Sequence, residues 1–106
     1  MQPTLRLKKR YLAFKVDSPI SFTPQELDAV VHEALLKFLG EFGVARAGPI
    51  FLKERCKNNT FMLKINHHSV EAARSALILI KKIKNSPVIM RSITTSGTLK
   101  KAVERT

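Results

Sequence analysis

The chain has 106 residues, which is enough for one domain with a single core and too few for two. Hydrophobic residues make up 44% and charged residues 25%, a balance that excludes a disordered polyelectrolyte. Nineteen lysines and arginines against eight aspartates and glutamates give a net charge of +11. That charge favours a polyanionic partner, and nucleic acid is the commonest polyanion in a cell.

The charge is unevenly distributed along the chain. Glu26, Asp28, Glu33 and Glu41 share one stretch with a single base, Lys37, so that this stretch carries −3 and the remainder carries +14. This asymmetry indicates a docking surface on one side of the protein and not non-specific association over the whole surface.

Other features exclude further classes. Cys56 is the only cysteine, which excludes an internal disulfide and a cysteine-rich zinc site. The longest strictly apolar run, Ala76 to Ile80, is far shorter than a membrane span, and no long apolar core follows the basic N-terminus as in a secretory signal. We expect a soluble, cytoplasmic protein without a membrane partner.

The first predicted elements are a strand and a helix. Alternating apolar residues predict a strand over residues 10–17. Thr23, Pro24 and Glu26 form the capping box and first turn of a helix, whose apolar stripe runs from Leu27 to Phe42. Gly40 and Gly43 are predicted to end it, followed by a compact loop over residues 41–49.

The rest of the chain predicts two strands, a helix, a strand and a short helix. Strands are expected over residues 50–55 and 60–66, joined by a turn at residues 57–59 where two asparagines tolerate positive φ. Ser69 is expected to cap a helix reaching about Lys84, with lysines in its last turn. A strand over residues 88–95 follows, and Ser96 caps a short helix from Gly97 towards Arg105.

This order predicts an α+β protein with the RRM-like or ferredoxin-like βαββαβ sandwich. Two helices would pack on one face of a four-stranded antiparallel sheet, with a short C-terminal helix added. Residues 1–106 form a single domain, divided into a basic arm (residues 1–9), a core (residues 10–95) and a basic C-terminal segment (residues 96–106).

Basic and hydroxyl residues at both ends of the core are candidates for RNA binding, and a separate basic set surrounds the turn between the second and third strands, with Arg91 on the last strand. The first and last strands of this topology run in opposite directions, so the start of one lies near the end of the other. A solvated charged surface is the alternative, and edge-strand lysines also guard against aggregation. The predicted RNA-binding residues are Lys8, Lys9, Arg10, Lys53, Arg55, Lys57, Arg91, Ser96, Thr98, Lys100, Lys101 and Arg105.

A second candidate surface would bind protein. Tyr11, Ala13 and Met62 should face away from the helices, on an open sheet face that lacks the aromatic motif with which an RRM stacks bases. Ile78 and Leu79 are apolar residues outside the stripe that the second helix would bury, which indicates a contact with another subunit. Alternatively, the sheet face is half exposed without a partner, and the C-terminal segment folds back over Ile78 and Leu79.

No catalytic or metal site is predicted. His67 and His68 point to different sides of the chain, with only Cys56 as an extra ligand, so they are interpreted as the polar entry to the second helix. No nucleophile in a glycine-rich elbow and no carboxylate pair is present, so the chain is not expected to catalyse a reaction alone.

Two short motifs resemble one family. The segment Lys9-Arg10-Tyr11-Leu12-Ala13-Phe14 resembles the opening strand of the archaeal and eukaryotic ribonuclease P protein component 2. The segment Thr95-Ser96-Gly97-Thr98-Leu99-Lys100-Lys101 is similar to that family's closing signature, and residues 61–84 fit its middle portion. The resemblance spans roughly residues 9–101.

The resemblance implies a non-catalytic subunit of the ribonucleoprotein that removes the 5′ leader from precursor tRNA. It implies as partners the ribonuclease P RNA, precursor tRNA, the TIM-barrel-like protein component 3 and other holoenzyme proteins, with a possible homodimer inside a heterotetramer. No cofactor is expected on this chain, and Mg²⁺ would serve the holoenzyme RNA. The alternatives are a generic structured-RNA-binding or ribosomal protein and an ACT-like regulatory domain for a small ligand.

Overall fold

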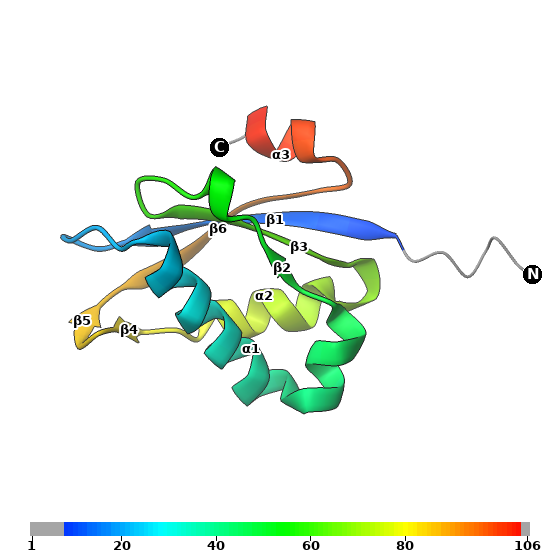
Figure 1. Ribbon diagram of the computed structural model, residues 1–106, viewed down its shortest axis with the longest axis horizontal. Helices are drawn as coiled ribbons and strands as arrows, with labels where there is room; N and C mark the ends of the chain where they lie inside the picture. The colour runs from blue at the N-terminus through cyan, green and yellow to red at the C-terminus, as the bar shows by residue number, and fades with distance from the viewer. Residues whose placement is uncertain (1–7, 105–106) are drawn as a thin grey trace, which may run out of the picture.

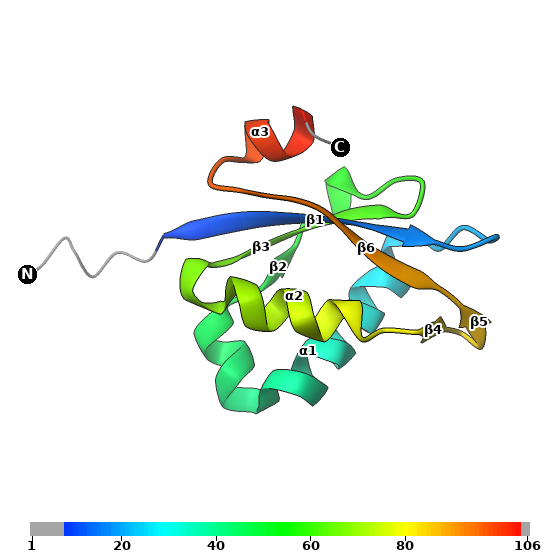
Figure 2. The same cartoon turned by 180° about the vertical axis from the view of Figure 1, so that it is seen from behind.

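A computed structural model describes residues 8–104 of the chain. In chain order the elements are β1 (Lys9–Asp17), α1 (Pro24–Ala47), β2 (Ile50–Phe51), the 3₁₀ turn η2 (Lys53–Arg55), β3 (Thr60–Asn66), the 3₁₀ turn η3 (His67–Ser69), α2 (Val70–Ile78), β4 (Lys82–Ile83), β5 (Ser86–Pro87), β6 (Ile89–Ser96) and α3 (Leu99–Glu104). Helices α1 and α2 cover one face of the main sheet, and α3 lies on the other (Figures 1 and 2). The predicted α+β sandwich is confirmed.

The main sheet has the strand order β2-β3-β1-β6, with β1 antiparallel to both of its neighbours. Phe14 lies opposite Phe61, and their rings stack with centroids 5.7 Å apart. Tyr11, Ala13 and Met62 were predicted to face away from the helices, and the apolar side chains that alternate with them along β1 and β3 all lie in one buried core: Leu12, Phe14, Val16, Phe61, Leu63 and Ile65. Alternation along β1 and β3 therefore identified the inner face correctly.

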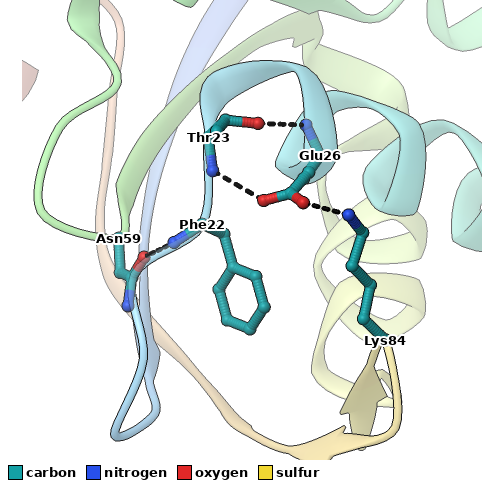
Figure 3. A network of polar contacts seen from close by, with 5 residues as sticks. All are labelled: Phe22, Thr23, Glu26, Asn59 and Lys84. Carbon is teal, nitrogen blue, oxygen red and sulfur yellow. Dashed lines mark hydrogen bonds and ion pairs between the residues drawn. The ribbon is translucent and has the colours of Figure 1, made fainter.

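Helix α1 begins as predicted, with a complete capping box (Figure 3). The hydroxyl of Thr23 accepts a hydrogen bond from the Glu26 N–H at 3.2 Å, and the Glu26 carboxylate accepts one from the Thr23 N–H at 2.9 Å. These bonds satisfy two N–H groups that a helix start otherwise leaves without partners.

The end of α1 differs from the prediction. Gly40 has φ 76° and ψ 173°, so it kinks the helix, but the helix resumes and continues to Ala47. Gly48, at φ 56°, ends it in the left-handed conformation. The predicted interruption at Gly40 is present, whereas the predicted stop at Gly43 and the predicted compact loop over residues 41–49 are wrong, because a second helical segment follows and buries Ala47 in the core.

The second predicted strand is much shorter than expected. Only Ile50 and Phe51 pair with β3, and residues 53–55 form the turn η2. The polar triplet Lys-Glu-Arg brings no apolar side chain to the sheet, so the chain leaves the sheet edge there. The turn that follows is confirmed: Asn58 and Asn59 adopt φ of 53° and 61° and lead into β3.

The second helix ends at Ile78 and not near Lys84. A separate hairpin of β4 and β5 follows, turning through Lys84 and Asn85, both at positive φ. The hairpin buries Ile83 in the core, and the left-handed conformation of Lys84 and Asn85 in its turn is incompatible with a helix that reaches Lys84. The prediction that lysines occupy the last turn of α2 is therefore wrong, and Ser69 makes no side-chain cap in the described structure.

A polar contact network fixes the start of α1 against the β-turn and the hairpin (Figure 3). The Asn59 side chain accepts a hydrogen bond from the Phe22 N–H at 2.8 Å and donates one to the Ile20 carbonyl at 2.8 Å. On the other side of the capping box, the Lys84 ammonium donates to the Glu26 carboxylate. Three segments that lie far apart in the sequence are thus held together.

Candidate nucleic-acid interface

The two terminal basic sets meet at one end of the sheet. Tyr11 pairs with Ser96, so the end of β6 lies beside the start of β1 (Figures 1 and 2). A methyl group added to Gly97 would lie 3.6 Å from Nη1 of Arg10. The predicted convergence of the first and last strands is therefore present in the structure.

Two of the cations at this end have roles within the chain. The Lys9 ammonium donates to the Asn66 side chain, and Arg10 donates to the Lys9 carbonyl at 3.0 Å. Lys8 is exposed, as are Lys100 and Lys101 on α3. We refer to Lys8, Lys100 and Lys101 as the terminal lysines; all three are available for contact with a phosphate backbone.

Helix α3 also links two sets that were predicted separately. Arg55 of η2 and Lys100 line the same open hollow of about 360 Å³, together with Leu99 and Val103. Lys57, in the turn before β3, is exposed. Arg105 lies outside the described residues.

Two predicted RNA-binding cations are already paired with carboxylates. Lys53 lies 3.6 Å from Asp28, and Arg91 lies 2.5 Å from Asp17. Exposed pairs of this kind are weak, so either cation can exchange its partner for a phosphate. They are nevertheless less available than the terminal lysines.

The two predicted hydroxyl donors act inside the chain. Ser96 is buried and its Oγ accepts a hydrogen bond from the Thr98 N–H at 3.2 Å. Oγ1 of Thr98 accepts one from the Lys101 N–H at 3.3 Å, so Thr98, and not Ser96, caps α3. An RNA contact by either residue stays a prediction.

The sheet face predicted to be open is closed over its middle by α3. Ala13, Met62 and Ala102 form a small buried cluster, against which Tyr11 and Leu99 pack. Ala13 and Met62 are 0% and 2% exposed, so the prediction that they offer a protein-binding surface is wrong for this conformation. The alternative that the C-terminal segment covers Ile78 and Leu79 is also wrong, because α3 lies on the opposite face of the sheet.

Charge is divided between the two sides of the sheet. Lys15 pairs with Arg91 across β1 and β6 on the α3 side, and Lys64 lies on the same side with its ammonium 5.9 Å from the Tyr11 ring centroid. Helices α1 and α2 carry five of the eight acidic residues, Glu26, Asp28, Glu33, Glu41 and Glu71, against three basic ones, Lys37, Arg46 and Arg74, so the two helices themselves are net acidic. The α3 side is therefore the better surface for a polyanion.

Lys15 and Lys64 were missed as site residues, although their signal was in the sequence. Both alternate with core residues of β1 and β3, and this spacing places them on the outer face. The proximity of Arg55 to Lys100 could not be predicted from such spacing, because it depends on where α3 folds.

The described residues contain no group of three or more histidine, cysteine or acidic side chains placed to hold a metal ion. His67 and His68 are exposed, and the His68 ring contacts the Ser69 hydroxyl at 3.0 Å. Cys56 is a partly buried free thiol, and burial raises its pKa. Within residues 8–104, no helix is long and apolar enough to cross a membrane.

Comparison with known proteins gives a consistent result. Residues 10–106 match the model of the Rpp14/Pop5 family. The chain is 41% identical over 101 residues to ribonuclease P protein component 2 of Thermococcus kodakarensis, covering 95% of this chain and 84% of that protein. The protein of the same name from Pyrococcus abyssi is 39% identical over 101 residues, covering 95% and 86%. That from Methanocaldococcus jannaschii is 31% identical over 102 residues, covering 96% and 75%.

The structure also resembles a chain in the cryo-EM structure of yeast ribonuclease MRP. The TM-score is 0.66 at 15% sequence identity, and the match covers 89% of this chain and 77% of that one. At this identity the likeness shows a shared fold.

Proposed function

The chain belongs to the Rpp14/Pop5 family, and from this membership we propose that it is a non-catalytic protein subunit of ribonuclease P. In this role it supports the catalytic RNA in removing the 5′ leader from precursor tRNA. The family match and the relatives' names argue against the ribosomal and ACT-like alternatives. The observation that carries the proposal beyond the names is the division of charge across the sheet.

RNA is proposed to contact the α3 side and the end of the sheet where β1 begins. The exposed cations there are the terminal lysines and Arg55, and Lys15 and Lys64 extend the surface across the strands. A compact RNA brings phosphates close together, and fixed cations lower that repulsion. The subunit thus reduces the concentration of Mg²⁺ that the RNA needs, while Mg²⁺ itself is held by the RNA.

The protein partners are proposed to dock on the helix layer. The candidates for this layer are protein component 3 and the other holoenzyme proteins; the chain is further proposed to pair with a second copy of itself within a heterotetramer. Ile78, the last residue of α2, and Leu79, which follows it, are exposed, as the prediction of a protein interface requires. Ala13 and Met62 are not proposed, because α3 covers them.

Reconstitution tests the proposal. The ribonuclease P RNA and the other holoenzyme proteins are assembled with and without this chain, and precursor tRNA cleavage is followed while Mg²⁺ is titrated. We expect the chain to lower the Mg²⁺ concentration at half-maximal cleavage. Superimposable titration curves with and without the chain would refute the proposal.

A further inference from the structure

A groove runs between α1 and α2 on the layer that faces away from the basic side. It encloses a cavity of about 250 Å³. Its apolar lining comes from both helices and from the segment that follows α2: Val30, Ala34, Phe38, Ala76, Leu79 and Ile80. Phe38 and Leu79 are 51% and 57% exposed at its mouth. Exposed apolar area of this kind, gathered in one hollow, marks an interaction site.

The rim of the groove is basic. Lys37, Lys81 and Lys82 line it with a single carboxylate, Glu33. All three lysines are exposed, and none of them is among the ion pairs found within residues 8–104. We refer to Lys37, Lys81 and Lys82 as the groove lysines; they carry an excess positive charge with no acidic partner within the described chain.

The β4–β5 hairpin holds part of this rim in place. Ile83 is 1% exposed in the core, and Lys84 binds the Glu26 carboxylate at the start of α1. Lys82 pairs with Pro87 in the hairpin ladder, so its backbone position is fixed from both sides. The hairpin therefore fixes the point from which the Lys82 side chain reaches the groove mouth.

We propose that this groove binds an acidic amphipathic helix of another protein. The apolar stripe of such a helix would cover Phe38 and Leu79, and its acidic flanks would meet the groove lysines. From Val30 to Phe38 the groove follows α1 for about 12 Å, which matches roughly two turns of a bound helix. That length accommodates apolar side chains of the bound helix spaced at positions i, i+3 or i+4, and i+7.

Two other occupants fit less well. An RNA backbone would pair with the lysines but would leave Phe38 and Leu79 in contact with water. A second copy of this chain would bring one +11 molecule against another, which like-charge repulsion opposes. Only a partner that is both acidic and apolar can contact the apolar lining of the groove and the groove lysines together.

The inference rests on the proposed function in one respect: the partner is sought among the holoenzyme proteins. A photo-reactive benzoylphenylalanine replaces Leu79 in one variant and Leu36 in another, and each is irradiated in the reconstituted holoenzyme. Leu36 is a matched control, because it is an exposed leucine of α1 that does not line the groove. We expect position 79 to cross-link to an acidic helical segment of another protein. A cross-link to RNA, a cross-link to a second copy of this chain, or no cross-link would overturn the inference.

Substitutions give a second, quantitative readout. Leu79→Glu should weaken association with the partner protein at least tenfold, whereas Leu36→Glu should leave it unchanged, and neither should alter the affinity for ribonuclease P RNA. Equal effects of the two substitutions would contradict a groove-specific partner. The proposed function fails separately, if the unmodified chain has no effect on cleavage.

Discussion

The Asn59 side chain offers a sharp test of how this fold is held together. It is buried and accepts a hydrogen bond from the Phe22 N–H at 2.8 Å (Figure 3). It also donates one to the Ile20 carbonyl at 2.8 Å. Its backbone also adopts φ of 61°. Replacing it therefore perturbs two separable quantities, the hydrogen bonds and the left-handed backbone conformation.

Three substitutions separate these quantities. Asn59→Ala leaves the N–H of buried Phe22 without a partner, at about 1–3 kcal/mol, and adds about 1 kcal/mol for a methyl group at positive φ. Asn59→Gly removes the hydrogen bonds but tolerates the backbone conformation, so it should cost about 1 kcal/mol less than alanine. Asn59→Asp keeps the acceptor for Phe22 and should cost only about 0.5–1.5 kcal/mol while its carboxyl is protonated. Once ionised, the carboxylate would lie buried against the Ile20 carbonyl oxygen, at a larger cost.

Urea denaturation measures the free energy of unfolding of each variant. Asn58→Ala is the matched control, because Asn58 has φ of 53° but is exposed, so its loss reports the backbone cost alone, about 1 kcal/mol. At a pH below the ordinary carboxyl pKa, where the aspartate is protonated, the expected order of destabilisation at position 59 is alanine, then glycine, then aspartate. An aspartate variant as unstable as the alanine variant would refute the role given to the acceptor.

Three further predictions concern single residues. The pKa of the Glu26 carboxyl is lowered by the hydrogen bond from Lys84 and, to a smaller extent, by that from the Thr23 N–H. The ionised carboxylate therefore stabilises the fold at a pH above the ordinary carboxyl pKa, and this stabilisation is lost as pH falls through the lowered pKa. Thermal melts should show the stability advantage of the wild type over Glu26→Gln shrinking as pH falls below about 4, and an advantage independent of pH would contradict this. Burial raises the pKa of the Cys56 thiol, so iodoacetamide at pH 7.5 should modify it more slowly in the folded protein than in urea; equal rates would argue against burial. Ala102→Asp places a carboxylate in the cluster beneath α3, so limited proteolysis should cleave the C-terminal segment sooner than in the wild type, and an unchanged rate would show that the cluster does not hold α3.

Much of the fold follows from local patterns in the sequence. Alternation along residues 10–17 and 60–66 identified the buried side chains of β1 and β3, because a strand exposes its two faces with a period of two. The capping box at Thr23 predicted the start of α1 correctly, because its donors and acceptors lie within one turn. The predictions that failed depend on contacts distant in sequence. Helix α2 ends at Ile78 because the following hairpin buries Ile83 against the core, and the sequence between them still has helical periodicity.

The candidate interface was predictable only in part. The approach of Arg10 to Gly97 followed from the topology, since the first and last strands run antiparallel. The covering of Met62 by α3 did not, because it depends on where the segment after Gly97 folds, which no local pattern determines. The position of the groove lysines could not be predicted for the same reason. The sequence predicts Lys81 and Lys82 in the last turn of a helix, where they would compensate its dipole, whereas in the structure they line the same groove as Lys37.

The central claim is that RNA binds the side of the sheet that carries α3 and not the helix layer. The most direct test is the salt dependence of the affinity for ribonuclease P RNA, measured for two variants that each lose three exposed lysines: the terminal lysines in Lys8→Ala/Lys100→Ala/Lys101→Ala, and the groove lysines in Lys37→Ala/Lys81→Ala/Lys82→Ala.

Each phosphate contact contributes about 0.7–0.9 to the slope of log affinity against log salt, so losing the terminal lysines should flatten the slope by about 2 to 3. The variant lacking the groove lysines should keep the wild-type slope. Equal flattening in both variants, or flattening only in the groove variant, would contradict the claim.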